Sequence, residues 1–126
     1  MDAVECRKMP AVMGDESVVI TATHEDIALI RLRGAIDEDS APGLTRALAE
    51  AAASGKSRTV VDLSEASFAD SHALHALLDA QNLHRAAGVS LVLAGPLQAG
   101  IRRLFEVTGT AAAFRITDSL ESAMTC

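Results

Sequence analysis

Aromatic residues are almost absent from this sequence: three of its 126 residues are Phe, and none is Tyr or Trp. Proteins that bind single-stranded nucleic acid stack the bases on aromatic side chains. A net charge of −6 also opposes contact with phosphate backbones and with anionic membrane surfaces. We therefore expect no nucleic-acid partner and no membrane insertion.

Cysteine is scarce too, with only Cys6 and Cys126, at opposite ends of the chain. Two such residues offer no disulfide framework and no zinc-binding spacing. No apolar run approaches the roughly 18 residues of a membrane span. The basic pair Arg7 and Lys8 is not followed by the apolar core of a signal peptide. These absences predict a soluble, cytoplasmic protein.

Residues 1–16 mix Pro, Gly, Met and charges without a period, which predicts a flexible arm. A single domain over residues 17–126 is expected to follow. Its β-branched run at 17–23 and its alternating run at 27–33 predict an antiparallel hairpin, with Leu32 inward and the neighbouring arginines outward. Gly34 then allows the chain to turn into an acidic loop at 35–39.

Helical and strand patterns alternate through the rest of the chain. Apolar runs at 59–63, 89–93 and 114–116 predict strands, the first of them covered on both faces. Stripes of apolar residues predict four helices. The first runs from a cap at Asp39 or Ser40 to a stop at Gly55 and buries Leu44, Ala47, Leu48 and Ala51, and the second runs from 71 to 87 and ends at Gly88. The third runs from Leu97 through Ile101, Leu104 and Phe105 to Gly109, and the fourth begins at a cap at Asp118, with Glu121 as its third residue. The order β-β-α-β-α-β-α-β-α predicts an α/β domain with a mixed, mainly parallel sheet of about five strands and about four helices.

The helix at 71–87 carries two different faces. Its predicted buried stripe consists of Leu74, Leu77, Leu78, Ala80, Leu83 and Ala87, and its predicted polar face consists of His72, His75, Asp79 and Asn82. The pair Asp70-Ser71 stands where a buried strand leads into this helix. One of the two is expected to cap the helix, at about 1 kcal/mol, which by itself would explain the pair.

Functional groups in α/β sheets gather at the C-terminal ends of strands, which is where Ser71 lies. A phosphate on Ser71 would meet the positive helix end and would be opposed by Asp70 and by Asp37 across the loop. Burying such a dianion against an apolar or acidic partner surface costs several kcal/mol. The position is therefore suited to a switch in which modification prevents docking.

Two other chemistries use the same residues. Ser71 with His75 could form a nucleophile and base, but the flanking glycines of a nucleophile elbow are missing, and we expect no enzyme. His72, His75 and Asp79 have a spacing that could hold a metal weakly. We interpret them as a solvated polar face and expect neither a metal nor a cofactor.

Several stretches together resemble the STAS domain of bacterial anti-sigma factor antagonists. They are Leu32–Asp37, Val60–Ser64, Phe68–Ser71, Ala87–Pro96 and Arg102–Gly109, in an order and spacing that fit the family from about Val18 to Met124. The family usually continues Ser-Gly-Leu after the modified serine, where this chain has His72-Ala73-Leu74.

The resemblance implies a STAS-type fold and a role in partner switching during bacterial stress responses. In the family, the serine after the Asp at this helix start is phosphorylated by an anti-sigma factor with a kinase-type ATP site. The unphosphorylated protein binds that factor and releases a sigma factor, which regulates transcription. By resemblance Ser71 is the phosphorylation site, and the partner surface consists of Asp37, Asp70, Ser71, His72, Ala73, Leu74 and His75. The alternatives implied are a STAS accessory subunit of an ABC-type lipid transporter and a STAS scaffold that is not phosphorylated.

Overall fold

The computed structural model describes residues 18–125, except for the side chain of Val18, so the arm predicted for residues 1–16 lies outside the described range. The elements are β2 (Val18–His24), β3 (Ile27–Ile36), α1 (Ala41–Ala52), β4 (Arg58–Ala69), α2 (Ser71–Ala87), β5 (Ser90–Ala94), α3 (Ala99–Thr108), a 3-10 helix (Ala111–Ala113), β6 (Arg115–Thr117) and α4 (Leu120–Thr125). The predicted α/β class and element order are confirmed. The short 3-10 helix was indicated by no sequence pattern.

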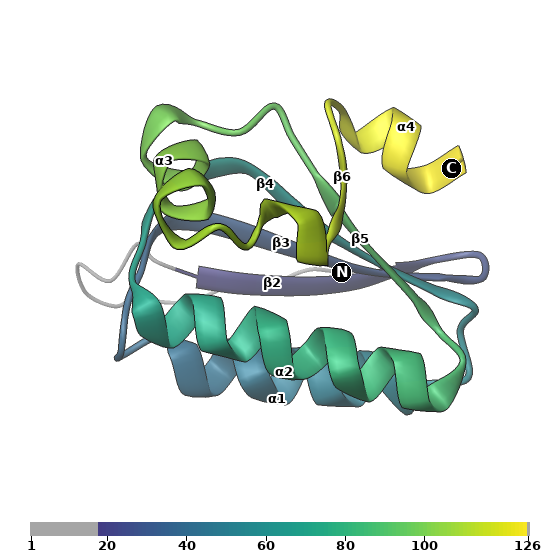
Figure 1. Cartoon of the computed structure of the whole chain (residues 1–126). Coiled ribbons are helices and arrows are strands. Elements are labelled where there is room, and N and C mark those ends of the chain that lie inside the picture. Colours follow the sequence, from purple (N-terminus) through teal and green to yellow (C-terminus); the bar gives the residue numbers. More distant parts are fainter. Residues whose placement is uncertain (1–17, 126) are drawn as a thin grey trace.

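The strands within residues 18–125 form one sheet in the order β2-β3-β4-β5-β6 (Figure 1). β2 and β3 pair antiparallel, with Thr21 opposite Ile30, and form the predicted hairpin. The other neighbours pair in parallel, because a helix carries the chain back over the sheet between successive strands. The C-terminal ends of β3 and β4 therefore meet at one edge of the sheet, and α2 begins there.

Helices α1 and α2 lie side by side against one face of the sheet (Figure 1). Their apolar stripes form the main core, which contains the predicted α1 residues Leu44, Ala47, Leu48 and Ala51. Helix α3 adds Ile101 and Phe105 to the same core. No helix within residues 18–125 is long and apolar enough to cross a membrane.

The second face of the sheet has a smaller core under α4. Ala123 of this helix is fully buried against Val60, Val92 and Ala94. Arg58 holds the helix in place, since its guanidinium donates to the carbonyl oxygen of Met124 at 2.7 Å. The middle of β4 is therefore buried on both faces, as the run at 59–63 predicts.

Two strands extend further than the sequence predicts. β3 continues through Gly34 to Ile36, where a loop is predicted from residue 35, and β4 continues to Ala69 rather than ending at Leu63. The two extensions pair with each other, Ile36 lying opposite Ala69. A register shift next to Gly34, whose φ of 77° is unfavourable for other residues, lets the pairing continue. The predicted acidic loop is therefore shorter and begins at Asp37, and the turn predicted after Leu63 was wrong, because that segment belongs to β4.

The predicted buried stripe of α2 is wrong in its second half. Leu83 is 46% exposed and Ala87 is also exposed, whereas His84 is completely buried. The buried face of the helix contains Ala80 and, four residues later, His84. Leu83 lies on a different face of the helix and is therefore at the surface. The imidazole can be buried because both ring nitrogens have partners, the Ala80 carbonyl oxygen and the Thr59 hydroxyl.

Glycine ends α2 and α3 as predicted, since Gly88 and Gly109 are the C-cap residues and have left-handed backbones. The stop predicted for α1 at Gly55 was wrong. That helix ends at Ala52 with Ala53 as its C-cap, and Gly55 belongs to the following loop.

The N-terminus of α4 also differs from the prediction. The helix begins at Leu120, and the hydroxyl of Ser119 accepts a hydrogen bond from the N–H of Ser122 at 3.0 Å. Ser119 therefore provides the capping contact that was assigned to Asp118. Asp and Ser are equally good caps by residue type, so which of the two caps α4 depends on where β6 ends.

Candidate functional site

Asp70 caps helix α2 with its side chain. Its backbone is extended, and its Oδ1 atom accepts from the N–H groups of His72 at 2.9 Å and of Ala73 at 3.2 Å. Partial burial would raise the pKa of the Asp70 carboxyl, but the hydrogen bonds from Ala73 and His72 outweigh it, so the pKa lies below its ordinary value. Asp70 is thus a charged cap, and of the two predicted cap candidates it is the one that acts.

Because Asp70 is the cap, Ser71 becomes the first residue of α2 and is exposed to solvent. Within the described part of the chain its hydroxyl makes no hydrogen bond. An exposed serine at the first helical position is free to react without breaking a contact that the fold needs.

The acidic loop between β3 and α1 is held next to this helix start. The N–H of Asp70 donates to the carbonyl oxygen of Ile36 at 3.2 Å, which joins the two strand ends. Asp37 follows directly, and its Oδ1 atom accepts from the N–H groups of Asp39 at 3.1 Å and of Ser40 at 3.3 Å. Asp37 therefore shapes the loop. The Ser40 hydroxyl makes no capping bond to α1.

The predicted partner surface is only partly exposed. Ser71, His72 and His75 are exposed, and Asp37 and Asp70 are half-buried. Ala73 and Leu74 face the main core and are almost completely buried. The structure thus narrows the accessible part of the predicted surface to the other five residues.

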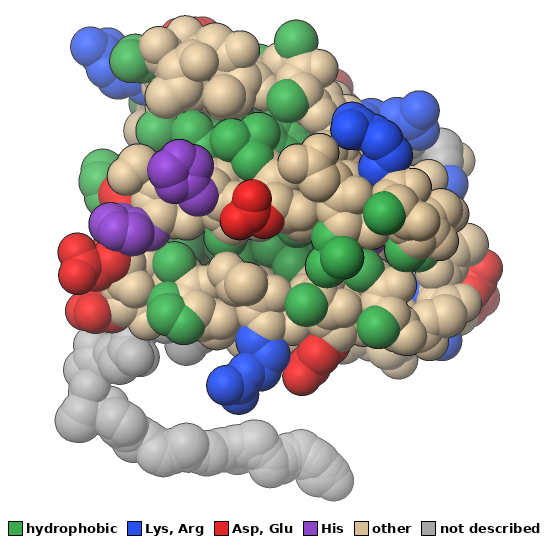
Figure 2. All heavy atoms as spheres, turned by 60° about the horizontal axis from the view of Figure 1, so that its bottom comes forward, with side chains coloured by type: hydrophobic (Ala, Val, Ile, Leu, Met, Phe, Trp, Pro, Cys, Tyr) green, Lys and Arg blue, Asp and Glu red, His purple; other side chains and the backbone are tan. Residues whose placement is uncertain are grey.

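A shallow groove between α1 and α2 begins beside Ser71. It is lined by Glu38, Ala41, Pro42, Thr45, His72, His75, Ala76 and Asp79. Figure 2 shows two histidine side chains next to each other at one end of this face, with acidic side chains beside them. Among residues 18–125, no three His, Cys, Asp or Glu side chains are close enough together to hold a metal ion.

Glu38 and Phe68 belong to this region but were not predicted as site residues. Glu38 lines the groove, and the acidic loop in the sequence was a signal for it. Phe68 lies on β4 two residues before Asp70 and is 51% exposed. A single aromatic residue in the run 64–69 was the available signal.

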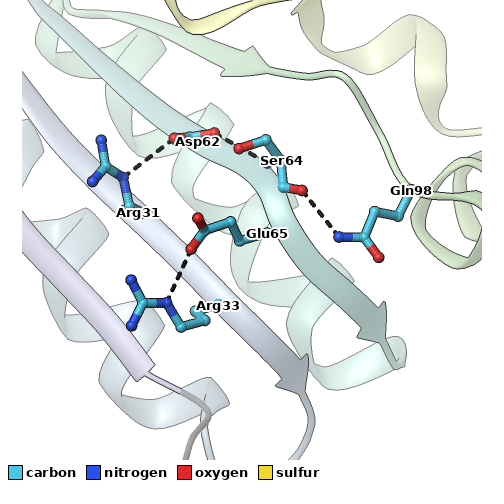
Figure 3. Close-up of polar contacts among 6 residues, drawn as sticks. All are labelled: Arg31, Arg33, Asp62, Ser64, Glu65 and Gln98. Carbon is cyan, nitrogen blue, oxygen red and sulfur yellow. Dashed lines mark hydrogen bonds and ion pairs between the residues drawn. The ribbon is translucent and has the colours of Figure 1, made fainter.

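A polar network connects β3, β4 and the start of α3 (Figure 3). Arg31 Nε donates to Asp62 at 3.3 Å and Arg33 Nε donates to Glu65 at 3.0 Å, across the two strands. Asp62 is buried, so its charge requires the Arg31 partner and the N–H of Ser64, at 3.0 Å. Gln98 Nε2 donates to the Ser64 carbonyl oxygen at 3.0 Å and places α3 against β4. The network is structural and supports the strand end from which Ser71 follows.

Comparisons with solved structures return the same fold. An anti-sigma factor antagonist from Mycobacterium paratuberculosis has a TM-score of 0.73 and 27% identity, over 91% of this chain and 97% of that one. The anti-sigma factor antagonist SpoIIAA in its unphosphorylated form has a TM-score of 0.67 and 16% identity, over 86% of this chain and 94% of that one. The Bacillus cell fate determinant SpoIIAA in its phosphorylated form has a TM-score of 0.68 and 17% identity, over 86% and 97%.

The search of curated proteins returned no match. The family model described as the STAS domain matches residues 19–123, which include all or most of every described strand and helix. The sequence resemblance, the sheet order and this match agree, and the chain belongs to the STAS domain family.

Proposed function

We propose that this protein is a cytoplasmic anti-sigma factor antagonist that works by partner switching. Its unphosphorylated form binds an anti-sigma factor with a kinase-type ATP-binding domain, and a sigma factor is released. The anti-sigma factor phosphorylates Ser71, which ends the binding. The protein itself has no catalytic role in this scheme.

The observation that carries the proposal is the position of Ser71. It is the exposed first residue of α2, directly after the capping Asp70, in a chain of the STAS family. A relative with 27% identity is an anti-sigma factor antagonist, and SpoIIAA of the same fold is known both unphosphorylated and phosphorylated.

The local charges explain how a phosphate would act. Asp70 directly precedes Ser71, and Glu38 and Asp79 line the groove together with the next residue, His72, so the unmodified surface is already acidic. A phosphate adds a charge of about −1.5 to −2 at neutral pH. A partner that covers Ser71 would have to desolvate this charge, and each 1.4 kcal/mol of that cost weakens binding about tenfold.

The test is binding and phosphate transfer with a kinase-type anti-sigma factor and ATP. We expect phosphate on the wild type but not on Ser71→Ala, which should retain the wild-type affinity. Ser71→Asp should bind at least about tenfold more weakly, because it places a permanent charge in the interface. Calorimetry measures the affinity, and mass spectrometry of the mixture with ATP locates the phosphate.

Ser90→Asp is the matched control, since Ser90 is an exposed serine at the beginning of β5, at the opposite edge of the sheet. Equal weakening by Ser90→Asp and Ser71→Asp would contradict a local switch. Loss of binding in Ser71→Ala would do so as well. Capture of a transporter ATPase instead of a kinase-type protein would support the transporter alternative.

A further inference from the structure

Three N–H groups of the first turn of α2 already have acceptors. Asp70 Oδ1 accepts from the N–H groups of His72 and Ala73, and the Asp70 carbonyl oxygen accepts from the N–H of Leu74 at 3.1 Å. A phosphoryl group on Ser71 would have to displace the Asp70 carboxylate from these N–H groups or find a cation elsewhere.

The groove beside Ser71 contains no lysine or arginine among its lining residues. Its groups that can become positive are His72 and His75. Figure 2 shows the Lys and Arg side chains of this face lying away from the two adjacent histidines. Within this groove, the positive charge available to a phosphate at Ser71 therefore comes from these two imidazoles.

Both histidines lie in the first two turns of α2, the helix that begins at Ser71. His75 is four residues further along the helix, so its side chain lies on the same surface as Ser71 and leans toward the helix N-terminus. His72 Nδ1 lies 3.5 Å from Asp70 Oδ2, beside the helix start. Both side chains are exposed and can reorient without disturbing the core.

Resting on the proposed phosphorylation of Ser71, we propose that His72 and His75 in their protonated form bind the phosphoryl group. Phosphorylation is then accompanied by proton uptake, and the phosphorylated state is favoured on the acidic side of neutrality. Histidine changes charge between about pH 5 and 8, which makes the switch sensitive to pH in the physiological range.

Three carboxylates face the two histidines: Asp70 on the residue before α2, Glu38 on the loop before α1, and Asp79 one turn after His75. Helix α1 contributes only Ala41, Pro42 and Thr45 to the groove, and none of them titrates. The carboxylates also attract the protonated imidazoles when Ser71 is unmodified. The phosphoryl group adds a second attraction that exists only after modification.

The test uses the full chain with phosphoserine inserted at position 71 by genetic encoding, so that no kinase is needed. Phosphorus NMR then follows the second ionisation of the phosphate as a function of pH. Protonated imidazoles favour the dianion, so the ionisation midpoint should rise in the double variant His72→Gln/His75→Gln, by on the order of half a pH unit or more. His75→Lys keeps a cation at the same place and should preserve the low midpoint.

His24→Gln is the control, because His24 is an exposed histidine at the end of β2. The ionisation midpoint of the phosphate in this variant should equal that of the wild type. Circular dichroism checks that each variant is folded. Equal midpoints in the wild type and the double variant would overturn the proposal. That result would leave the phosphorylation of Ser71 standing, whereas failure of the anti-sigma factor to modify Ser71 would refute the proposed function even if the two midpoints differ.

Discussion

His84 is the one charged or titratable side chain of α2 that lies in the protein interior. Its Nδ1 atom is 2.8 Å from the carbonyl oxygen of Ala80 and its Nε2 atom is 2.8 Å from the hydroxyl oxygen of Thr59. A neutral ring with the proton on Nδ1 donates to Ala80 and accepts from Thr59. Burial lowers the pKa of His84, and the Ala80 carbonyl only partly opposes this. The residue is therefore held neutral by its surroundings.

A neutral buried histidine makes stability depend on pH. In the unfolded chain the imidazole takes up a proton near its ordinary pKa of about 6.5, and in the folded chain it does so only at lower pH. The contribution of the neutral His84 imidazole to the free energy of unfolding is fully present above about pH 6.5 and is lost as the pH falls below that value. We expect the free energy of unfolding to decrease from pH 7.5 to pH 5.5, and we expect a smaller decrease in His84→Gln.

Urea unfolding followed by circular dichroism measures this dependence, which suits a chain without Trp or Tyr. His24→Gln removes an exposed histidine and should keep the wild-type slope. A slope in His84→Gln that matches the wild type would show that carboxyl groups, and not His84, cause the acid sensitivity.

At the scale of elements, two helical glycines should respond oppositely to the same substitution. A Cβ atom at Gly100 of α3 would lie 2.8 Å from the carbonyl oxygen of Ser67, and a Cβ atom at Gly43 of α1 would meet nothing within 4 Å. Gly43→Ala should therefore stabilise the protein by up to about 1 kcal/mol, the helix propensity difference. Gly100→Ala should destabilise it by about 1–3 kcal/mol, because α3 must move away from β4.

Thermal unfolding of the two variants in parallel makes this comparison. Each glycine lies in the first turn of its helix, so the intrinsic gain is similar and the difference reports on the contact with Ser67. Stabilisation by both substitutions would mean that α3 adjusts its position on β4 at no cost.

The sequence identified the elements where a pattern is local. The stripe of α1 and the glycine ends of α2 and α3 follow from spacing and residue type alone, and so did Asp70-Ser71 as a helix start. The second half of β4 did not, because the run 64–69 contains no β-branched residue and becomes a strand only by pairing with the end of β3. His84 was missed because a histidine is polar by type, and only the Thr59 hydroxyl and the Ala80 carbonyl make its burial favourable.

In the candidate site, too, some residues are predicted by a local pattern and others depend on contacts between residues far apart in the sequence. Ser71, His72 and His75 were found because they stand at a strand-to-helix junction with helical spacing. Glu38 joins them only through the hydrogen bond that draws the end of β3 to Asp70, a contact between residues far apart in the sequence. Whether a residue at this junction faces solvent or core, as for Ala73, depended on the exact phase of the helix.

For the whole molecule, the sheet is the element that both cores share. Leu93 of β5 belongs to the main core under α1 and α2, and its neighbour Val92 belongs to the smaller core under α4. Both side chains are completely buried. Because successive residues of one strand support opposite faces, neither core can be lost while the other keeps its strand. The described domain should therefore unfold as one cooperative unit.

Truncating each of these two residues tests the cooperativity. Leu93→Ala should lower the free energy of unfolding by about 2–5 kcal/mol, and Val92→Ala by about 1.5 kcal/mol or more, since it removes two buried carbon atoms at about 0.8 kcal/mol each. Both should lower the urea midpoint in a single transition with the wild-type m-value, because the surface exposed on unfolding is unchanged. Val107→Ala, at a position 72% exposed on α3, should change stability by no more than about 0.5 kcal/mol. A second transition or a reduced m-value in Val92→Ala would instead mean that α4 and its core unfold independently of the rest of the sheet.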